Sequence, residues 1–241
     1  MQYFRRLLLL LFLFVTGIIY AEGQENADTE IFTKDDIIKF TEKKYGLDDF
    51  LINGEKYLPL NIKVNGSPYF EWDKSIEAKL YITGQLYSNI KIEYDINLNE
   101  LVLNNGQGVH VILNSSLVDS FYLGYNCFIK LNEQKGSTEQ YGYFEKVFVG
   151  KSLLLKQHKK SIITIYNDLN PNGSFSSNKY EYFIYNQATL INVSSKKLFL
   201  RFYEPYRKDI KKFISRNGIK YKGVSNEELY KLMIFCEAKS K

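Results

Sequence analysis

The residues able to carry chemistry are few and scattered along the chain. His110 and His158 are the only histidines, and neither has a second nitrogen or thiolate ligand at the spacing that zinc sites use. His110 falls on the polar side of an alternating run, and two lysines follow His158. We therefore predict surface or hydrogen-bonded roles for both histidines, with no metal site and no other cofactor.

No serine or glycine stands in a recognisable catalytic motif. The chain has no G-x-S-x-G elbow, because Gly173-Ser174-Phe175 falls in a polar loop. Gly106-Gln107-Gly108 lies between two strand-like runs, so no helix follows it to hold a phosphate. The sequence identifies no catalytic residue. It leaves enzymatic activity open and favours a non-enzymatic role.

Carboxylates offer one route to acid-base chemistry. Asp95, Asp119, Glu145 and Asp168 lie at positions typical of a polar strand face or a turn. Two carboxylates about 5 to 10 Å apart in one cleft would be the signature of a glycan hydrolase. A hydrolase acting on an envelope polymer is therefore our alternative to a binding protein.

Cys127 and Cys236 allow at most one disulfide. Cys127 lies in an apolar strand-like run and Cys236 on an apolar helix face. Free cysteines are usually buried, which favours two reduced thiols. An oxidising compartment would favour a bridge between them. Both interpretations stay open at this point.

The composition is rich in aromatic residues, with 20 Tyr and 17 Phe against a single Trp. Strand propensity explains most of them, because aromatic side chains fill sheet faces. Some tyrosines would instead suit a ligand face for a peptide, glycan or lipid, since the ring buries a large area and keeps a polar tip. These candidates are Tyr122, Tyr125, Tyr141, Tyr143, Tyr180, Tyr182 and Tyr185.

The elements that must position these residues follow an export signal. Arg5 and Arg6 precede an unbroken apolar run, Leu7 to Val15, and the small Ala21 comes shortly after it. This is the order of a signal peptide. The run is shorter than the roughly 20 residues that a membrane span needs. We expect a signal peptide over 1–21, cleaved after Ala21, and no transmembrane anchor afterwards.

The remaining chain has the size and charge of one globular domain. Two of the 32 basic residues and none of the 27 acidic residues precede residue 22, which leaves a net charge of +3. Such a balance gives nucleic-acid binding no support. About 220 residues can bury a sufficient hydrophobic core without disulfide bonds or a bound metal ion. We predict a disordered segment over 22–32 and a single β-rich domain over 33–241.

Period-two alternation of apolar and polar residues dominates after Pro68. No segment between the runs is long enough for a crossover helix, so the pairing should be antiparallel. The predicted fold is mainly β, an antiparallel meander curled into an open or partly closed barrel-like sheet. The expected strands lie at 78–82, 90–94, 101–103, 109–113, 117–123, 127–131, 141–149, 152–156, 161–166, 180–185, 189–193 and 198–202.

Helices are predicted at both ends of the domain. Thr33 caps a short N-terminal helix, 33–45, with Asp36 in its first turn. Two amphipathic helices follow from about residue 204. Gly218 ends the first, and Ser225 with Glu228 forms a capping box for the second. The second should pack on the sheet through its apolar positions, Leu229, Leu232, Met233 and Cys236.

Two turns are also predicted. Asn53-Gly54 is the residue pair of a type I′ hairpin, in which both positions take positive φ. The stretch 167–178 is rich in small polar residues, with Pro171 and Gly173 among them, and is predicted to be a flexible insertion within the sheet.

Several segments resemble a group of uncharacterised exported proteins from Bacteroidetes. These are Gly84-Gln85-Leu86-Tyr87, Ile92 to Ile96, Glu100 to Leu103, Gly142 to Glu145 and Val149-Gly150. The resemblance covers most of the chain after the signal and rests on the spacing of Gly, Tyr and Asp. It implies that the protein is located in the periplasm or cell envelope, and it assigns no functional residue to this chain.

The leading hypothesis is thus an exported envelope protein that uses an aromatic-rich sheet face, or the interior of the curled sheet, as a binding or interaction module. Its expected partner is an apolar or polymeric envelope ligand or a protein. The hydrolase is the first alternative. A small outer-membrane barrel is the second, because alternating strands with many aromatic residues also suit one.

Overall fold

The structure is a computed structural model that describes residues 33, 36, 51, 54–58, 63–71, 76–104, 110–131 and 142–240. The chain divides into two units, 1–47 and 48–241. In the first unit, Thr33 and Asp36 form the predicted cap, because the Thr33 N–H donates to Asp36 Oδ2 at 3.0 Å and the Asp36 N–H donates to Thr33 Oγ1 at 3.3 Å. The predicted signal, the segment 22–32 and the rest of this helix lie outside the described residues.

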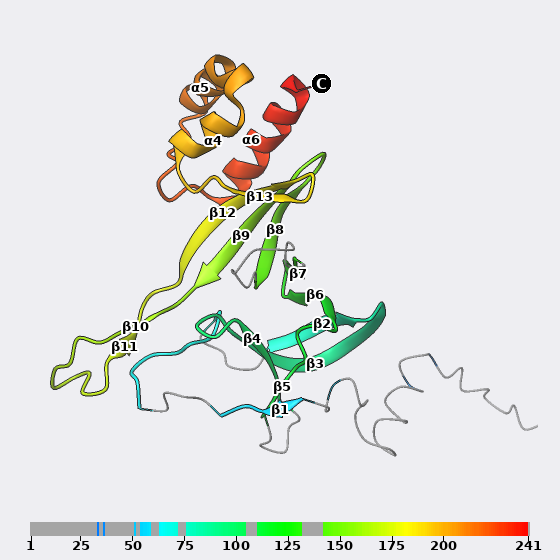
Figure 1. The fold of residues 1–241 in the computed structure, drawn as a ribbon, viewed down its shortest axis with the longest axis vertical. Helices are drawn as coiled ribbons and strands as arrows, with labels where there is room; N and C mark the ends of the chain where they lie inside the picture. Colours follow the sequence, from blue (N-terminus) through cyan, green and yellow to red (C-terminus); the bar gives the residue numbers. More distant parts are fainter. Residues whose placement is uncertain are drawn as a thin grey trace, which may run out of the picture. The chain divides into compact units, whose positions relative to one another are not determined.

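The second unit contains an antiparallel sheet whose strands join in the order β1-β5-β4-β3-β2-β6-β7-β8-β9-β12-β13 (Figure 1). The sheet stays open, so the predicted mainly β, antiparallel fold is confirmed in its open form. Its strands are β1 (Glu55–Lys56), β2 (Ile76–Ile82), β3 (Gln85–Asp95), β4 (Glu100–Asn104), β5 (His110–Ile112), β6 (Val118–Leu123), β7 (Asn126–Lys130), β8 (Tyr143–Val149), β9 (Leu153–Lys159), β12 (Lys179–Asn186) and β13 (Thr189–Asn192).

The strand order departs from a simple meander where β6 and β1 join the sheet. β2 to β5 pair consecutively, and so do β6 to β9, but β6 pairs with β2 instead of β5. The short β5 pairs on its other edge with β1. This also corrects the predicted hairpin at Asn53-Gly54: β1 pairs with β5, which is distant in sequence, and Gly54 is not among the residues with positive φ.

A second, two-stranded sheet follows β9. β10 (Ile162–Ile163) pairs with β11 (Ser174–Phe175), and the parallel bridge between Asn65 and Ser174 borders β11 on its other side. We call Ile162–Phe175 the arm. Figure 1 shows it beyond the ends of β9 and β12, away from the C-terminal helices. The predicted insertion, 167–178, therefore contains a paired strand.

The C-terminal region holds α4 (Lys196–Phe202), η1 (Glu204–Tyr206), α5 (Arg207–Arg216) and α6 (Asn226–Lys239). The strand predicted at 198–202 is wrong, because α4 occupies it. Ser195 caps α4 by accepting the Leu198 N–H at 3.2 Å, and the helix buries two adjacent residues, Phe199 and Leu200. Gly218, with φ +62°, ends α5 as predicted.

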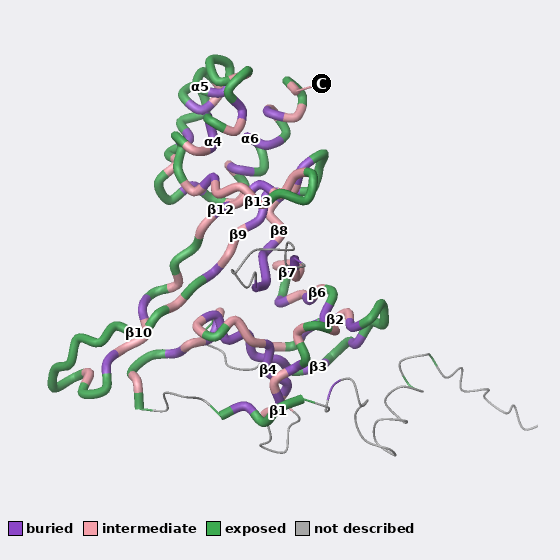
Figure 2. The backbone as a smooth tube through the Cα atoms, in the orientation of Figure 1, coloured by how far each residue is buried: buried purple, intermediate pink, exposed green. Residues whose placement is uncertain are grey.

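Helix α6 confirms its predicted start and its predicted apolar face. Ser225 and Glu228 form the reciprocal capping box. Leu229, Leu232, Met233 and Cys236 are fully buried, in one core with residues from α4, α5 and the strands β8, β9 and β12. The helices thus cover one face of the sheet at its β8 to β13 end, and Figure 2 shows buried residues in both the strands and the helices there.

The other end of the sheet is held by a short segment beside β3. Residues Ser67–Phe70, which we call the strap, pair with the end of β3 in an antiparallel bridge between Tyr69 and Asp95: the Phe70 N–H donates to the Tyr94 carbonyl at 2.8 Å, and the Ile96 N–H donates to the Pro68 carbonyl at 3.1 Å. The Phe70 ring meets Phe128 edge-on at 5.3 Å. An aromatic core therefore fills this end of the sheet.

Candidate functional site

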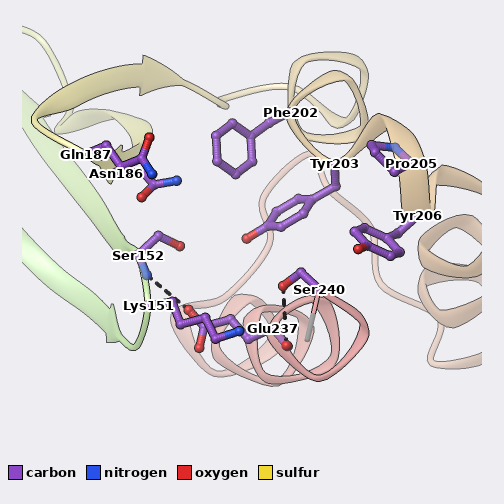
Figure 3. Close-up of a pocket in the computed structure, with 10 residues that line it drawn as sticks. All are labelled: Lys151, Ser152, Asn186, Gln187, Phe202, Tyr203, Pro205, Tyr206, Glu237 and Ser240. Atoms are coloured by element: carbon purple, nitrogen blue, oxygen red, sulfur yellow. Dashed lines mark hydrogen bonds between the residues drawn. The ribbon is translucent and has the colours of Figure 1, made fainter.

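A cleft of about 540 Å³ opens where two strand turns meet the helices (Figure 3). Four segments distant in sequence contribute to it: the β8–β9 turn, the β12–β13 turn, the corner between α4 and α5, and the last turn of α6. The residues that line it are Lys151, Ser152, Asn186, Gln187, Phe202, Tyr203, Pro205, Tyr206, Glu237 and Ser240.

Aromatic rings form the helical wall of the cleft. Phe202 and Tyr203 end α4 and pack edge to face at 4.8 Å. Pro205 lies in the first turn of η1, which sets Tyr206 beside them. In Figure 3 the Phe202 ring lies on the side of Asn186 and Gln187, and the hydroxyl of the buried Tyr203 points toward Ser152. This hydroxyl donates to the Met233 sulfur at 3.7 Å. The wall thus combines apolar ring area with phenolic hydroxyls.

Glu237 joins the helix to the opposite turn. Its Oε1 accepts the Ser152 N–H at 3.1 Å, and its Oε2 lies so close to Gly150 that a side chain there would collide with the carboxylate. Burial raises the pKa of the neighbouring Tyr203, and the charge of Glu237 raises it further, although a hydrogen bond with Ser152 lowers it. Tyr203 is consequently a neutral hydroxyl at neutral pH.

The β12–β13 turn at the cleft rim has an unusual backbone. Asn186 pairs with Thr189, so Gln187 and Ala188 form a two-residue loop with φ values of +46° and +60°. Such turns favour Asn and Gly, because other residues are strained at positive φ. This turn holds the Gln187 backbone at the cleft in a conformation that its side chain disfavours. Strained backbone of this kind is concentrated at functional sites in proteins.

A second polar cluster lies on the helix-covered face, buried under the start of α6. Nε2 of His158 and Oε2 of Glu145 are 2.6 Å apart, with side chains only 4% and 5% exposed. Asn178 Nδ2 lies 3.0 Å from His158 Nδ1, and Asn226 Nδ2 donates to Glu145 Oε1 at 2.8 Å. Lys156 Nζ is 3.7 Å from Glu145 Oε2. The cluster therefore ties β8, β9 and the segment before β12 to α6.

These contacts determine the charge of Glu145. Burial alone would raise the pKa of the carboxyl, but the hydrogen bond from His158, the charges of Lys156 and His158, and the Asn226 amide together lower it below its usual value. Both ring nitrogens of His158 and both oxygens of Glu145 already have protein partners. This arrangement suits a structural link better than proton transfer to a ligand.

Another buried carboxylate, Asp95, lies at the end of β3, beside the strap. Asp95 Oδ2 accepts the Tyr57 hydroxyl at 2.8 Å, and Oδ1 accepts the N–H groups of Asn97 and Leu98 at 2.8 and 2.9 Å. Lys160 Nζ donates to the carbonyls of Ser67 and Tyr69 at 2.9 and 2.6 Å. This site therefore secures the strap and the β3–β4 turn.

The predicted carboxylates do not share a cleft. Asp95 and Glu145 are buried in separate clusters, whereas Asp119 and Asp168 are exposed. Asp95 is at a turn, as predicted, but Glu145 lies on a buried strand face instead of a polar one. The sequence predicted either a surface role or a hydrogen-bonded role for each histidine, and His158 has the hydrogen-bonded role. His110 is partly exposed, with Nδ1 3.5 Å from Glu93 Oε2.

The predicted tyrosines are not brought together. Tyr143 and Tyr182 are core residues. Tyr122 lies opposite Cys127 on β7, and the hydrogen bond with this thiol raises the pKa of Tyr122. Exposed or partly exposed positions are Tyr125, Tyr180 and Tyr185, and Tyr141 lies outside the described residues. None of the described six lines the cleft.

The two cysteines are also apart in the fold. Cys127 is a partly exposed free thiol on β7, and Cys236 is a buried free thiol on α6, so the structure does not join them. Burial, with the nearby Glu237 charge, raises the pKa of the Cys236 thiol to about 12. Cys236 therefore acts as an unreactive core residue.

Sequence reasoning missed the cleft because its walls come from four separate turns and helix ends. The one local signal was Phe202-Tyr203-Glu204-Pro205-Tyr206, an aromatic cluster around a proline that a strand prediction partly absorbed.

Across the described ranges, no group of His, Cys, Asp and Glu side chains is arranged to hold a metal ion. Within the same ranges, no helix has the length and apolar character needed to cross a bilayer. Comparisons of the chain with protein-family models, curated proteins and solved structures found no match.

Proposed function

We propose that this chain is an exported cell-envelope protein that binds a hydroxyl-rich polymer, a glycan chain, without chemical turnover. The observation that carries the proposal is the cleft, where Phe202, Tyr203 and Tyr206 stand opposite Asn186 and Gln187 (Figure 3). The proposed location in the cell envelope rests on the signal-peptide pattern of residues 1–21.

The lining fits the two kinds of surface that a sugar ring presents. The C–H face of a pyranose packs on aromatic rings such as Phe202 and Tyr206, while its hydroxyls need donors and acceptors in fixed positions. Amide groups of Asn186 and Gln187 supply both. Two-torsion aromatic side chains lose little conformational entropy on binding, which favours weak but specific recognition.

Binding is favoured over the hydrolase alternative by the carboxylates of the cleft. Among the described residues that line it, Glu237 is the single acid, and one of its oxygens accepts the Ser152 N–H. Glycan hydrolysis usually needs two carboxyl groups facing one another across the bond. The cleft of this chain offers one carboxylate, engaged in holding a turn.

The test is titration of the purified protein with soluble neutral oligosaccharides and peptidoglycan glycan fragments, followed by calorimetry. We expect at least one probe to bind, and Tyr206→Leu to weaken that binding by about tenfold, the loss of roughly 1.4 kcal/mol. Tyr125→Leu is the matched control, because Tyr125 is a fully exposed tyrosine outside the cleft.

The proposal fails if no glycan probe binds, or if both tyrosine variants weaken binding equally. It also fails if only peptides bind at Tyr206. Thermal unfolding of each variant shows whether a loss of binding reflects a loss of folded protein.

A further inference from the structure

The arm exposes an unusual concentration of apolar side chains. Ile163, Ile165, Tyr166 and Leu169 are 40%, 70%, 65% and 84% exposed. They fall within seven residues of one another, on a two-stranded element whose position is seen in Figure 1. Exposed apolar residues gathered in this way mark interaction sites.

Along Ser161–Tyr166, the main chain directs hydrogen-bonding groups to two sides. One side faces β11, and the other faces outward. The Ser176 N–H donates to the Ser161 carbonyl at 2.8 Å, and the Ile163 carbonyl faces Gly173, where an added Cβ would lie 2.6 Å from the oxygen. Because successive residues of a strand direct their N–H and C=O to opposite sides, Ile162 and Thr164 direct theirs away from β11. Among the described residues, no strand pairs with that outer edge.

The sequence of this edge lacks the usual protection. Natural edge strands carry Lys, Pro or a bulge that prevents pairing with other chains. The run Ser161–Tyr166 reads Ser-Ile-Ile-Thr-Ile-Tyr, without a charge, a proline or a glycine. Short uncharged segments with this strand propensity pair readily with an added strand.

We infer that the outer edge of the run Ser161–Tyr166, which contains β10, pairs with the same edge of a second copy of this chain. The pairing is antiparallel and centred on Thr164, so that the two copies are related by a two-fold axis. Thr164 then exchanges two hydrogen bonds with its equivalent, and Ile162 exchanges two with Tyr166 of the other copy.

Self-complementarity is the argument for a second copy as the occupant. In this register Ile163 lies opposite Ile165, and Ile162 lies opposite Tyr166, which are apolar and aromatic pairs that stabilise sheets. Thr164 lies opposite Thr164, another favourable pair. A shift that centres the axis on Ile165 would instead place Ile162 opposite Asp168. This inference goes beyond the proposed glycan binding and does not depend on it.

The first test measures the mass of the purified protein by light scattering and sedimentation over a range of concentrations. We expect a monomer–dimer equilibrium. Thr164→Pro should weaken dimerisation by more than about tenfold, since both symmetry-related N–H donors are removed. The substitution suits the monomer, because the Thr164 N–H points outward and proline is compatible with strand edges. Leu169→Lys is the control: it removes an exposed apolar residue outside the paired run and should leave the dimer intact.

The second test fixes the register by cross-linking. In a Cys127→Ser background, Thr164→Cys should form a disulfide dimer on mild oxidation, because the paired Cα atoms would lie about 5.5 Å apart. Ile162→Cys is the matched control and should not, because its equivalent lies four residues away along the partner strand. The buried Cys236 stays unreactive.

A protein that is monomeric at every concentration overturns the inference, as does a dimer that Thr164→Pro leaves unchanged. Equal cross-linking of the two cysteine variants overturns the register. Binding of the monomer to phospholipid vesicles, abolished by Leu169→Lys, would assign the exposed residues to a membrane surface and also overturn it.

Discussion

The two ends of the sheet each bury a carboxylate, yet they use it in different ways. At the helix end, Glu145 is held by a histidine, a lysine and an amide from α6. At the strap end, Asp95 is held by a phenol and two backbone N–H groups. Both anions tie a neighbouring segment to the same sheet, and Glu145 does so with two basic partners, Lys156 and His158, from the adjacent strand β9.

The cross-strand row that joins the two ends shows where the chemistry changes. From β3 to β12 the directly opposed residues are Tyr87, Leu80, Phe121, Phe128, Glu145, Lys156 and Tyr182. The row is apolar up to β7 and charged at β8 and β9. The strap end is therefore held chiefly by ring packing, and the helix end by ring packing together with a compensated charge cluster that depends on pH.

Breaking the helix end through its apolar contacts should have the largest effect. Leu232 is fully buried on α6, so Leu232→Asp places a charge in the interface between helix and sheet. We expect it to lower the free energy of unfolding by about 4 kcal/mol or more, measured by urea denaturation. Ile234→Asp on the same helix, at a half-exposed position, should cost less than about 1 kcal/mol. Equal losses would show that α6 is not docked on this face.

Removing the Glu145 carboxylate comes next. Glu145→Ala leaves Lys156 and the buried ring of His158 without their acceptor, and we expect a loss of about 3 kcal/mol. Glu181→Ala is the matched control, because Glu181 forms an exposed pair with Lys159 at 2.9 Å, and exposed pairs contribute about 0 to 1 kcal/mol. If Glu145→Ala is as mild as the control, water replaces the carboxylate and the cluster is not a link.

The strap end should respond less to loss of its charge. Asp95→Ala removes the acceptor for Tyr57 and two backbone donors, and we expect a loss of about 2 kcal/mol. Asp95→Asn keeps an oxygen for the backbone donors, so the expected loss is below about 1 kcal/mol. Chemical denaturation of the two variants distinguishes the contribution of the hydrogen-bond acceptor from that of the negative charge. A severe effect of Asp95→Asn would mean that the strap also depends on the anion.

Acid should weaken the helix end through Glu145, by less than the substitution does. Because the folded pKa of this carboxyl lies below the reference value of 4.5, its contribution is fully present above pH 4.5 and is lost as the pH falls towards the folded pKa. Urea denaturation between pH 6 and pH 3 should show this loss in the parent protein. The Glu145→Gln variant should lose less over the same range. If the free energies of unfolding of the two proteins fall in parallel with pH, Glu145 does not contribute to the loss of stability in acid.

The elements themselves were largely predictable, because local chemistry determines them. Alternation located β2, β3 and β12, and the capping box at Ser225 located the start of α6. The face on which Glu145 lies was not predictable. The pairing of β8 with β9 shifts register between Lys146 and Phe148, so Glu145 and Phe148 share a face that strict alternation would separate. A bulge of this kind leaves no mark in the apolar pattern.

His158 and α4 were obscured for related reasons. His158 follows Leu153-Leu154-Leu155, which is apolar on both faces, so the buried face of β9 cannot be identified from the sequence. The apolar pattern of 198–202 is compatible with the periodicity of a helix or of a strand. Its helical state comes from the Ser195 cap and from burial of Phe199 and Leu200 together. The cleft depends on the meeting of such segments, and no local pattern encodes it.

The single pairing of β6 with β2 also has a kinetic consequence. Within each of the series β2 to β5 and β6 to β9, neighbouring strands are close in sequence and can form as hairpins. The seam between the series, where Leu80 lies opposite Phe121, must wait until the chain has closed a much longer loop, and contacts of this kind slow folding. We expect Phe121→Leu to slow refolding in stopped-flow measurements more than it accelerates unfolding, because the sheet face cannot become continuous before this seam closes.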